Sequence, residues 1–324
     1  MQPSRPMLSL IVPVFNEEVV IDVFCARVVP ILDEITPDWE IVFVNDGSRD
    51  RTVEAVTRQH QAEPRIALFS LSRNFGKEIA MTAGLDMARG EAVVIIDVDL
   101  QDPPELIGEL VAKWREGYDV VFARRLEREG ETILKRITAH GFYRALNAIA
   151  DPPIPADVGD FRLMSRRAVD ALLKLRERHR FMKGLYAWIG FPQAEVTYVR
   201  APRAAGKSKY NYWRLWNFSI EGFTSFSIRP LQVATYFGFL IALLAVLYGS
   251  FIILQTLFYG NPVAGYPSLL VVVLLLGGVQ LISLGVIGEY LGRIFNETKQ
   301  RPLYIVANSI PSRDVSAVQS STTG

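Results

Sequence analysis

The sequence has a single cysteine, Cys25, in a chain of 324 residues. One thiol excludes an internal disulfide and a zinc site built from several cysteines, and it fits a reducing compartment. The formal net charge of +1 says nothing about binding to nucleic acid, because it averages over a polar region and a membrane region. We expect no disulfide framework, and we name no nucleic acid among the expected partners.

Two nucleotide-binding motifs are also missing. The first predicted strand is not followed by Gly-x-Gly-x-x-Gly, and the chain has no Gly-Lys-Ser/Thr loop of the P-loop type. Dehydrogenase and P-loop ATPase functions lose their main support. The apolar run at residues 7–14 is too short for a signal peptide and is followed at once by Asn16, Glu17 and Glu18. We expect the first two hundred residues to stay in the cytoplasm.

Charge is absent from two long apolar runs, residues 231–258 and 268–288. Each exceeds the roughly 20 residues that cross the hydrocarbon core of a bilayer. Buried helices of a soluble protein are the alternative. Two such runs in succession, with seven aromatic residues between positions 210 and 226, favour two membrane spans preceded by an interfacial helix. A helix packed under the domain is the other interpretation of that aromatic segment.

Basic residues flank both runs, whereas residues 259–266 between them are uncharged. Arg214 and Arg229 precede the first run. Arg293, Lys299 and Arg301 follow the second. The positive-inside rule then predicts a multi-pass membrane protein with both ends in the cytoplasm. Small residues at Gly277, Gly278, Gly285 and Gly288 suggest self-association into a homo-oligomer, for which a tetramer is one option.

The first two hundred residues alternate between strand and helix patterns. Strands are expected at residues 7–14, 39–44, 65–71, 93–96 and 118–123, with helices ending near 35 and 88 and spanning 105–116. A short strand near 157–165, two helices and an edge strand at 195–199 follow. This alternation predicts an α/β fold with a mostly parallel sheet that is covered by helices on both faces.

Acidic residues follow several of these strands. Glu17 follows the first and Asp46 the second, while the fourth is followed by Asp97, Asp99 and Asp102. Ligands of open α/β sheets bind at the carboxyl ends of the strands, and two aspartates one residue apart, with Gln101 beside them, suit Mg²⁺ or Mn²⁺. An isolated Asp-x-Asp is more often an acidic turn with a helix cap, so the motif needs support from the rest of the chain.

Two segments are rich in basic residues. Residues 200–220 contain five lysines or arginines and no acid, a composition suited to binding phosphate groups. From residue 134 to 149 apolar residues recur at helical spacing within a basic segment, which predicts an amphipathic helix in a membrane interface or on an ordinary surface.

These motifs together resemble a known family: the inverting family 2 glycosyltransferases of GT-A (Rossmann-like) fold, within them the polyprenyl-phosphate glycosyltransferases. GtrB-type undecaprenyl-phosphate glucosyltransferases and dolichyl-phosphate mannose synthase are the types it is most similar to. The motifs lie at residues 12–18, 44–48, 71–77, 97–104 and 159–162, with Arg203 and residues 206–210. The resemblance implies a cytoplasmic GT-A domain at 1–210, an interfacial helix at 211–229, two transmembrane helices within 230–290 and a cytoplasmic tail at 291–324 whose end is disordered.

The resemblance also implies roles for individual residues. Donor contacts would come from Pro13, Phe15, Glu17, Val44, Asp46 and Gln101. Metal ligands would be Asp97, Asp99 and Gln101. Phosphate-binding groups would be Arg124, Lys183, Arg203, Lys207 and Lys209. The catalytic set would consist of Asp97, Asp99, Asp160, Arg203 and Lys209. Asp160 would either orient the sugar or act as an auxiliary base.

The implied reaction is transfer of one sugar from a nucleotide sugar, UDP-glucose in the first instance, to a polyprenyl phosphate such as undecaprenyl phosphate, with inversion and with Mg²⁺ or Mn²⁺. The chain has no Gln-x-x-Arg-Trp motif of processive synthases, which favours a single transfer. GDP-mannose, UDP-N-acetylglucosamine and an aminoarabinose donor stay open. From other classes, a non-catalytic membrane subunit for flipping or sensing lipid-linked sugars and an anchored nucleotidyltransferase stay open as well.

Overall fold

The computed structural model describes residues 6–125, 158–178, 180–198 and 265–312, together with scattered positions between 236 and 258. The chain forms two compact units. One comprises Met1–Leu215 with Arg301–Gly324, and the other Trp216–Gln300.

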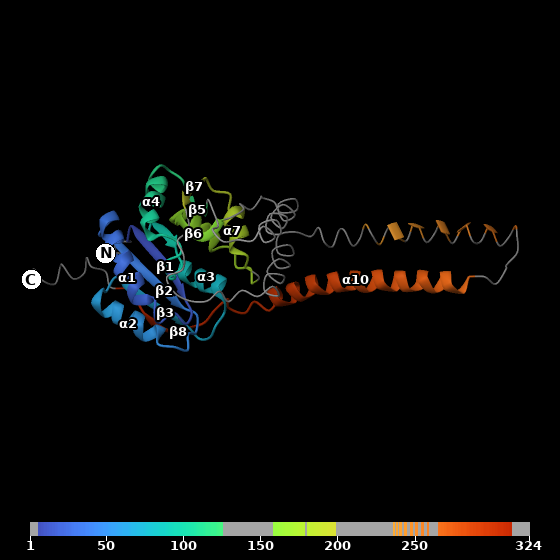
Figure 1. Ribbon diagram of the computed structural model, residues 1–324, viewed down its shortest axis with the longest axis horizontal. Coiled ribbons are helices and arrows are strands. Elements are labelled where there is room, and N and C mark those ends of the chain that lie inside the picture. Colours follow the sequence, from blue (N-terminus) through green and yellow to red (C-terminus); the bar gives the residue numbers. More distant parts are fainter. Residues whose placement is uncertain are drawn as a thin grey trace, which may run out of the picture. The chain divides into compact units, whose positions relative to one another are not determined.

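The first unit is an α/β domain, as predicted (Figure 1). Its strands are β1 (Leu8–Val14), β2 (Trp39–Asn45), β3 (Ile66–Leu71), β4 (Ala92–Ile95), β5 (Val120–Arg125), β6 (Val158–Ser165), β7 (Gln193–Tyr198) and β8 (Val306–Ile310). Its helices are α1 (Ile21–Ile35), α2 (Thr52–Ala62), α3 (Lys77–Met87), the short 3-10 helix η1 (Pro104–Leu106), α4 (Ile107–Arg115), α6 (Arg166–Leu172) and α7 (Met182–Trp188). Within the described residues of this unit, the predicted strands and helices are confirmed, and α2 is an additional helix.

The strands form one sheet in the order β7-β5-β6-β4-β1-β2-β3-β8. Among them only β6 and β8 run against the others. The carboxyl ends of β1, β2, β3 and β4 therefore meet at one edge, and the antiparallel β6 begins at that same edge. The expected edge strand near residues 195–199 is β7, at one end of the sheet.

Both faces of the central sheet are buried, which explains the nearly continuous apolar runs of its strands. Leu10 and Val12 of β1 pack with α1, α2 and α4 in the main core. On the opposite face, Val42 and Val44 of β2 pack with Ala80 and Ala83 of α3. The helices thus lie on both sides of the sheet, as the alternating sequence pattern predicts (Figure 1).

Helix α3 lies unusually close to the sheet at Gly84. A Cβ atom at this position would lie 2.3 Å from Cγ2 of Ile11 and 3.3 Å from Cγ2 of Val44. Only glycine permits this separation. The position of α3, and of Lys77 at its first turn, depends on this contact.

The C-terminal segment forms part of the sheet of the first unit. The sequence pattern assigned residues 291–324 to a tail, but β8 pairs antiparallel with β3 as the edge strand of the sheet. The Tyr304 hydroxyl donates to Asp86 Oδ2 at 2.8 Å, and Ser312 Oγ donates to Glu40 Oε2 at 3.0 Å. Five residues are too short a pattern to reveal a strand whose partner lies more than two hundred residues away. Residues after 312 lie outside the described part of the chain.

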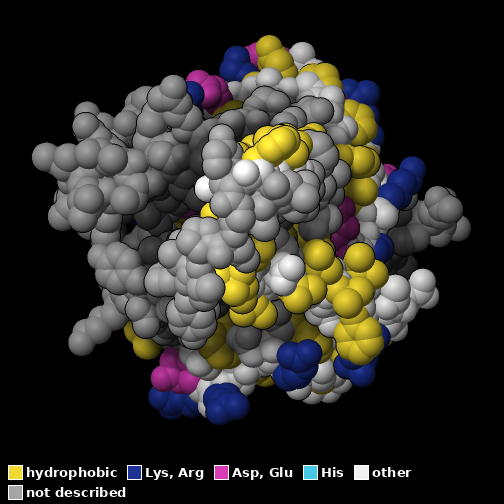
Figure 2. All heavy atoms as spheres, turned by 90° about the vertical axis from the view of Figure 1, so that its right-hand side faces the viewer, with side chains coloured by type: hydrophobic (Ala, Val, Ile, Leu, Met, Phe, Trp, Pro, Cys, Tyr) yellow, Lys and Arg dark blue, Asp and Glu magenta, His cyan; other side chains and the backbone are white. Residues whose placement is uncertain are grey.

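The second unit contains α10 (Tyr266–Thr298), a helix of 33 residues. It includes the apolar run predicted at 268–288 and extends beyond the expected end near 290. Within it, Leu275–Thr298 is long and apolar enough to cross a membrane, with a mean hydropathy of 1.4 in its most apolar window. Large apolar side chains such as Leu281 (71% exposed) and Ile282 (70% exposed) lie on its surface. In the space-filling view of Figure 2, hydrophobic side chains gather toward the middle of the visible face, and Lys and Arg side chains lie mostly toward its margin.

Three predicted segments cannot be compared with the structure. The basic helix at 134–149 and the interfacial helix at 211–229 lie outside the described residues. Of the first apolar run, 231–258, only scattered positions are described, and these are helical. The structure thus describes one of the two predicted spans as a continuous helix.

Glu40 of β2 joins three parts of the first unit. Its carboxylate, 3% exposed, accepts hydrogen bonds from Ser9 Oγ at 2.6 Å, from Arg89 Nη2 at 2.9 Å and from Ser312 Oγ at 3.0 Å. We predict that Glu40→Ala lowers the free energy of unfolding by roughly 2–3 kcal/mol, because it leaves charged and polar groups without an acceptor. Arg89 is 39% exposed, which limits the loss.

The measurement is a urea titration of the full chain in detergent. Glu54→Ala, an exposed substitution on α2, is the matched control and should change the free energy of unfolding by less than about 0.5 kcal/mol. Equal effects of the two substitutions would contradict the role given to Glu40.

Candidate active site

The predicted acids meet at one edge of the sheet. Glu17 follows β1, Asp46 follows β2, and Asp97 and Asp99 follow β4, so all four stand at the carboxyl ends of parallel neighbouring strands. We call this group the acidic edge. The topology confirms that these residues share one side of the domain, where ligands of open α/β sheets bind.

An ion triad forms at the acidic edge. Nζ of Lys77 lies 2.6 Å from Oδ1 and 2.8 Å from Oδ2 of Asp97, and 2.8 Å from Oδ2 of Asp160. The side chains are 43%, 31% and 19% exposed, respectively. We call Lys77, Asp97 and Asp160 the Lys77 triad. Sequence reasoning placed Lys77 in a matching motif but gave it no role, because its partners depend on the fold.

Strand register explains why Asp160 faces Asp97. Strand β6 pairs antiparallel with β4, and Ile95 of β4 lies opposite Arg162 of β6. Two residues further along this register, Asp97 comes level with Asp160. The short strand expected near residues 157–165 is thus β6, and Asp97 and Asp160 meet although they are more than sixty residues apart in sequence.

The Asp160 carboxyl is held as an anion. Burial alone would raise its pKa, but the charge and hydrogen bond of Lys77, helped by Lys183 and Arg162, lower it to about 2. For Lys77, burial lowers the pKa, but Asp97 and Asp160 more than offset this and raise it well above its ordinary value. A carboxylate with so low a pKa is a weak proton acceptor, which favours the orienting role for Asp160 over that of an auxiliary base.

Asp97 and Asp99 are presented by a turn with unusual backbone geometry. Val98 and Leu100 point into the core, at 4% and 5% exposure, so Asp97 and Asp99, which alternate with them, face outward. Leu100 has φ +55°, a left-handed conformation that is rare for a bulky residue. The backbone N–H of Gln101 then donates to Asp99 Oδ1 at 3.1 Å. Strain of this kind concentrates at functional sites.

The next two side chains in this segment are buried. Asp102 is 2% exposed and accepts a hydrogen bond from the Tyr198 hydroxyl of β7. It therefore contributes to the packing of the domain. Gln101 is 5% exposed, and its contact with metal or donor stays a prediction.

Asp46 fixes the loop that carries Lys77. Its carboxylate, 3% exposed, accepts hydrogen bonds from Phe75 N at 2.7 Å and Gly76 N at 2.9 Å. Burial raises its pKa despite these hydrogen bonds. Gly47 (φ +71°) permits this approach, since a Cβ atom there would lie 2.6 Å from the Arg73 carbonyl carbon. The structure thus shows a positioning role for Asp46, and its direct donor contact stays a prediction.

The other predicted donor residues differ in exposure. Phe15 is 37% exposed, whereas Val44 is fully buried against α3, so its side chain is not available to a donor. Pro13 pairs with Val44 in the sheet. The backbone N–H of Glu17 donates to Thr52 Oγ1 at 2.9 Å, which joins the loop after β1 to the start of α2. Donor contacts from Pro13 and Glu17 stay predictions.

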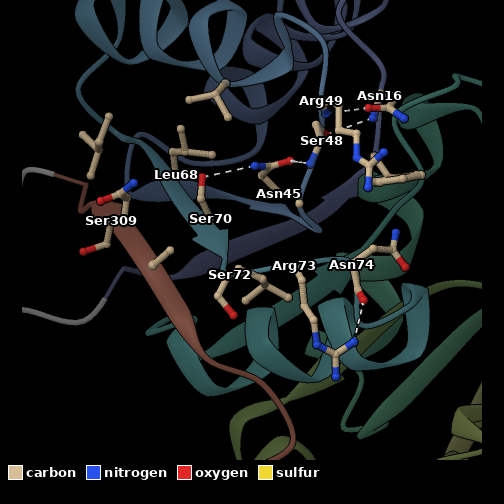
Figure 3. Close-up of a pocket in the computed structure, with 17 residues that line it drawn as sticks. Asn16, Asn45, Ser48, Arg49, Leu68, Ser70, Ser72, Arg73, Asn74 and Ser309 are labelled. Atoms are coloured by element: carbon tan, nitrogen blue, oxygen red, sulfur yellow. Dashed lines mark hydrogen bonds between the residues drawn. The ribbon is translucent and has the colours of Figure 1, made fainter.

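A pocket of about 610 Å³ lies beside the acidic edge, over β3 and β8 (Figure 3). Polar side chains form much of its wall, and Asn45 Nδ2 donates to Ser70 Oγ at 3.3 Å. Of the residues predicted to contact the donor, Phe15 lines this pocket. Its other lining residues are Asn16, Asn45, Gly47, Ser48, Arg49, Val53, Leu68, Ser70, Leu71, Ser72, Arg73, Asn74, Ala307, Asn308, Ser309 and Ile310.

A buried polar layer lies behind the Lys77 triad. The Arg162 guanidinium, whose residue is 3% exposed, lies 3.6 Å from the centroid of the Tyr186 ring and donates to Gly159 O at 2.7 Å. Glu78 Oε2 accepts from the backbone N–H of Met182, the first residue of α7, at 2.8 Å. These contacts connect α3, β6 and α7.

The predicted phosphate-binding residues have different surroundings. Lys183 of α7 is close enough to Asp160 and Glu78 for its charge to affect both carboxyl groups, so the structure brings it toward the triad. Arg124 of β5 is instead paired with Glu195 at 3.2 Å. Arg203, Lys207 and Lys209 lie outside the described residues.

The described residues contain no group of three or more His, Cys, Asp or Glu side chains arranged to bind a metal ion. Asp97 and Asp99 nevertheless supply hard oxygen ligands on adjacent outward positions. Mg²⁺ sites often use one or two carboxylates and complete the shell with water and substrate phosphates. The donor set therefore fits a cation that shares its coordination with a diphosphate.

Glu78 supplies a pH-dependent test of the layer behind the triad. Burial and the Asp160 carboxylate raise its pKa from 4.5 to about 7, against smaller effects of the Met182 N–H, Lys77 and Lys183. Between pH 4.5 and 7 the folded state thus keeps a proton that the unfolded state has released. The stabilising contribution of the neutral carboxyl group is fully present below pH 4.5. The contribution is lost as the pH rises to 7, and it amounts to at most on the order of 3 kcal/mol.

We predict that Glu78→Gln, which keeps an acceptor for Met182 N–H, gains stability relative to the parent chain between pH 5 and pH 8. The measurement is urea unfolding in detergent with EDTA at both pH values. Glu91→Gln, at an exposed position, is the control and should show no such trend. An unchanged difference between Glu78→Gln and the parent at the two pH values would contradict the raised pKa.

Two family descriptions match the chain: Glycosyl transferase family 2 over residues 9–173 and GtrB C-terminal hairpin over residues 229–294. The uncharacterized glycosyltransferase sll0501 of Synechocystis sp. is 53% identical over 93% of this chain and 95% of its own. The bactoprenol glucosyl transferase of Shigella phage SfV is 53% identical over 93% of this chain and 98% of its own. The prophage bactoprenol glucosyl transferase homolog of Escherichia coli K12 is 50% identical over 92% of this chain and 98% of its own.

Among solved structures, glucosyl-3-phosphoglycerate synthase of Mycobacterium tuberculosis covers 66% of this chain and 76% of its own at 23% identity, with a TM-score of 0.44. That likeness is too distant to assign ligands. The family descriptions and the relatives cover the sheet domain, its acidic edge and the C-terminal hairpin. The chain therefore belongs to glycosyl transferase family 2 and is a glycosyltransferase with the C-terminal hairpin of the GtrB type.

Proposed function

We propose that the enzyme transfers a single glucose from UDP-glucose to a polyprenyl phosphate, undecaprenyl phosphate in a bacterial membrane, with inversion at the anomeric carbon. The observation that carries this proposal is the likeness to proteins named bactoprenol glucosyl transferase. The relative from phage SfV shares 53% identity over 98% of its own length, which includes both the catalytic domain and the hairpin.

The acidic edge supports a role for Mg²⁺ or Mn²⁺. Asp97 and Asp99, with Gln101 beside them, would hold the cation, which when bound neutralises charge on the departing nucleoside diphosphate. The end of β1 carries three predicted donor residues, Pro13, Phe15 and Glu17. The pocket that Phe15 lines offers space for the nucleoside. Asp160 lies beside Asp97 in the Lys77 triad and would orient the sugar.

The acceptor needs little activation. The second pKa of a phosphate monoester is near ~6, so the lipid phosphate is mostly a dianion at neutral pH. A strong general base is then unnecessary, in agreement with an Asp160 carboxyl whose pKa is about 2. The main tasks are to bring two polyanions together and to orient them. Basic residues near the site would serve this purpose: Arg124, Lys183, Arg203, Lys207 and Lys209.

The membrane hairpin would keep the catalytic domain at the lipid headgroups. Helix α10 supports one membrane span, and the match to the GtrB hairpin over residues 229–294 supports the pair. We propose a multi-pass protein of the inner membrane with both ends in the cytoplasm and a homo-oligomeric assembly. The interfacial helices at 134–149 and 211–229 would bring the acceptor phosphate within reach of the acidic edge.

The donor is tested directly by a panel of nucleotide sugars. Purified enzyme in detergent is incubated with undecaprenyl phosphate, Mn²⁺ and one of UDP-glucose, UDP-N-acetylglucosamine, GDP-mannose or a UDP-aminoarabinose. We expect a monohexosyl lipid by mass spectrometry, and release of UDP, with UDP-glucose at a rate at least tenfold above the others. A higher rate with another donor would replace the glucose assignment. No transfer with any donor would support the non-catalytic alternative.

The metal assignment is tested at Asp99. We predict that Asp99→Asn lowers kcat at least 100-fold at saturating Mn²⁺, because removing one preorganised group that stabilises transition-state charge costs this much in other enzymes. Asp170→Asn, an exposed change on α6, is the control and should leave the rate within twofold. Near-full activity of Asp99→Asn would show that the acidic edge does not bind the cation through this residue.

A further inference from the structure

Lys77 occupies the position from which Asp97 would bind a cation. Both carboxylate oxygens of Asp97 lie within 2.8 Å of the ammonium nitrogen, which also reaches Asp160. In the free enzyme, therefore, the outward carboxylate of the acidic edge already has a positive partner. A divalent cation that bound Asp97 with Lys77 still in place would place two cations on one carboxylate.

The backbone of Lys77 is fixed by contacts that its ammonium group does not share. Asp46 accepts hydrogen bonds from the two preceding backbone N–H groups, and Gly84 fixes α3 against the sheet. The side chain itself is 43% exposed. Lysine has four rotatable bonds and a compact charge, so its ammonium can change partner while the backbone stays in place.

A diphosphate would provide that new partner. It brings negative charge to the same edge and would share the cation with Asp97 and Asp99. Among the described residues, the layer behind the triad offers Lys77 no anionic partner as close as Asp160. In the described structure, Glu78, the other carboxyl near the triad, is turned to the Met182 N–H.

We propose that Lys77 is a place-holding cation. It neutralises Asp97 and Asp160 in the donor-free enzyme, opposes binding of the metal alone, and moves to the diphosphate when metal and nucleotide are bound together. Lys77 thereby couples the two ligands, so that each binds more tightly in the presence of the other. The inference rests on the proposed function, since it takes the metal and the nucleoside diphosphate as ligands of this edge.

The experiment measures Mn²⁺ affinity by electron paramagnetic resonance of free Mn²⁺ with the full chain in detergent, without any sugar or lipid. The affinity for Mn²⁺ is measured without nucleotide and with saturating UDP or GDP. The proteins compared are the parent chain, Lys77→Met, Lys77→Gln and Lys77→Arg. Lys113→Met is the matched control, because Lys113 forms an exposed pair with Glu116 on α4 at 2.8 Å.

We expect the two neutral variants at position 77 to bind Mn²⁺ alone about tenfold more tightly than the parent, and the enhancement by nucleotide to shrink about tenfold. Lys77→Arg should keep weak binding of the metal alone, and Lys113→Met should match the parent. Unchanged or weaker Mn²⁺ binding by both neutral variants, with melting temperatures like that of the parent, would overturn the inference.

A further variant separates this inference from the proposed function. Asp97→Asn should abolish Mn²⁺ binding if Asp97 is a ligand. Parent-like Mn²⁺ affinity in Asp97→Asn would contradict the metal assignment, and the inference about Lys77 with it. Loss of binding in Asp97→Asn, together with no gain in Lys77→Met, would leave the metal assignment intact and reject only the place-holding role.

Discussion

The contact of one ammonium group with two carboxylates holds together the residues at the acidic edge of this enzyme. Asp97 comes from a strand in the parallel part of the sheet, and Asp160 from the antiparallel β6 beside it. Lys77 comes from a third element, the start of α3. Like charges at this separation would repel each other without the lysine. Its position depends in turn on Asp46, which binds the preceding loop, and on Gly84, which lets α3 approach the sheet.

This arrangement suits an enzyme whose proposed substrates are both polyanions. An acidic edge alone would repel a nucleotide diphosphate and a lipid phosphate. With Lys77 in the triad and Lys183 nearby, part of this negative charge is neutralised in the free enzyme, and the carboxylates are retained for a divalent cation. The very low pKa of Asp160 fits a reaction in which the acceptor is already an anion. Charge placement, more than proton transfer, is then the main contribution of the protein.

Much of the fold follows from sequence, because strand and helix patterns and the acids at strand ends are local features. The strands ending before Asp46 and Asp97 are where the apolar runs predict them. What sequence could not supply depends on pairing between distant segments. The partners of Lys77 require the register of β6, the burial of Asp102 requires Tyr198 of β7, and β8 is a strand only because the edge of β3 is open to it.

The most direct test of this account is a structure of the full chain in lipid or detergent with Mn²⁺ and UDP bound. The account predicts that Nζ of Lys77 leaves Asp97 and lies at hydrogen-bond distance, about 3 Å, from an oxygen of the diphosphate, while the cation contacts Asp97 and Asp99. A structure in which both ligands are bound and Lys77 still lies between Asp97 and Asp160, as it does without them, would contradict the account.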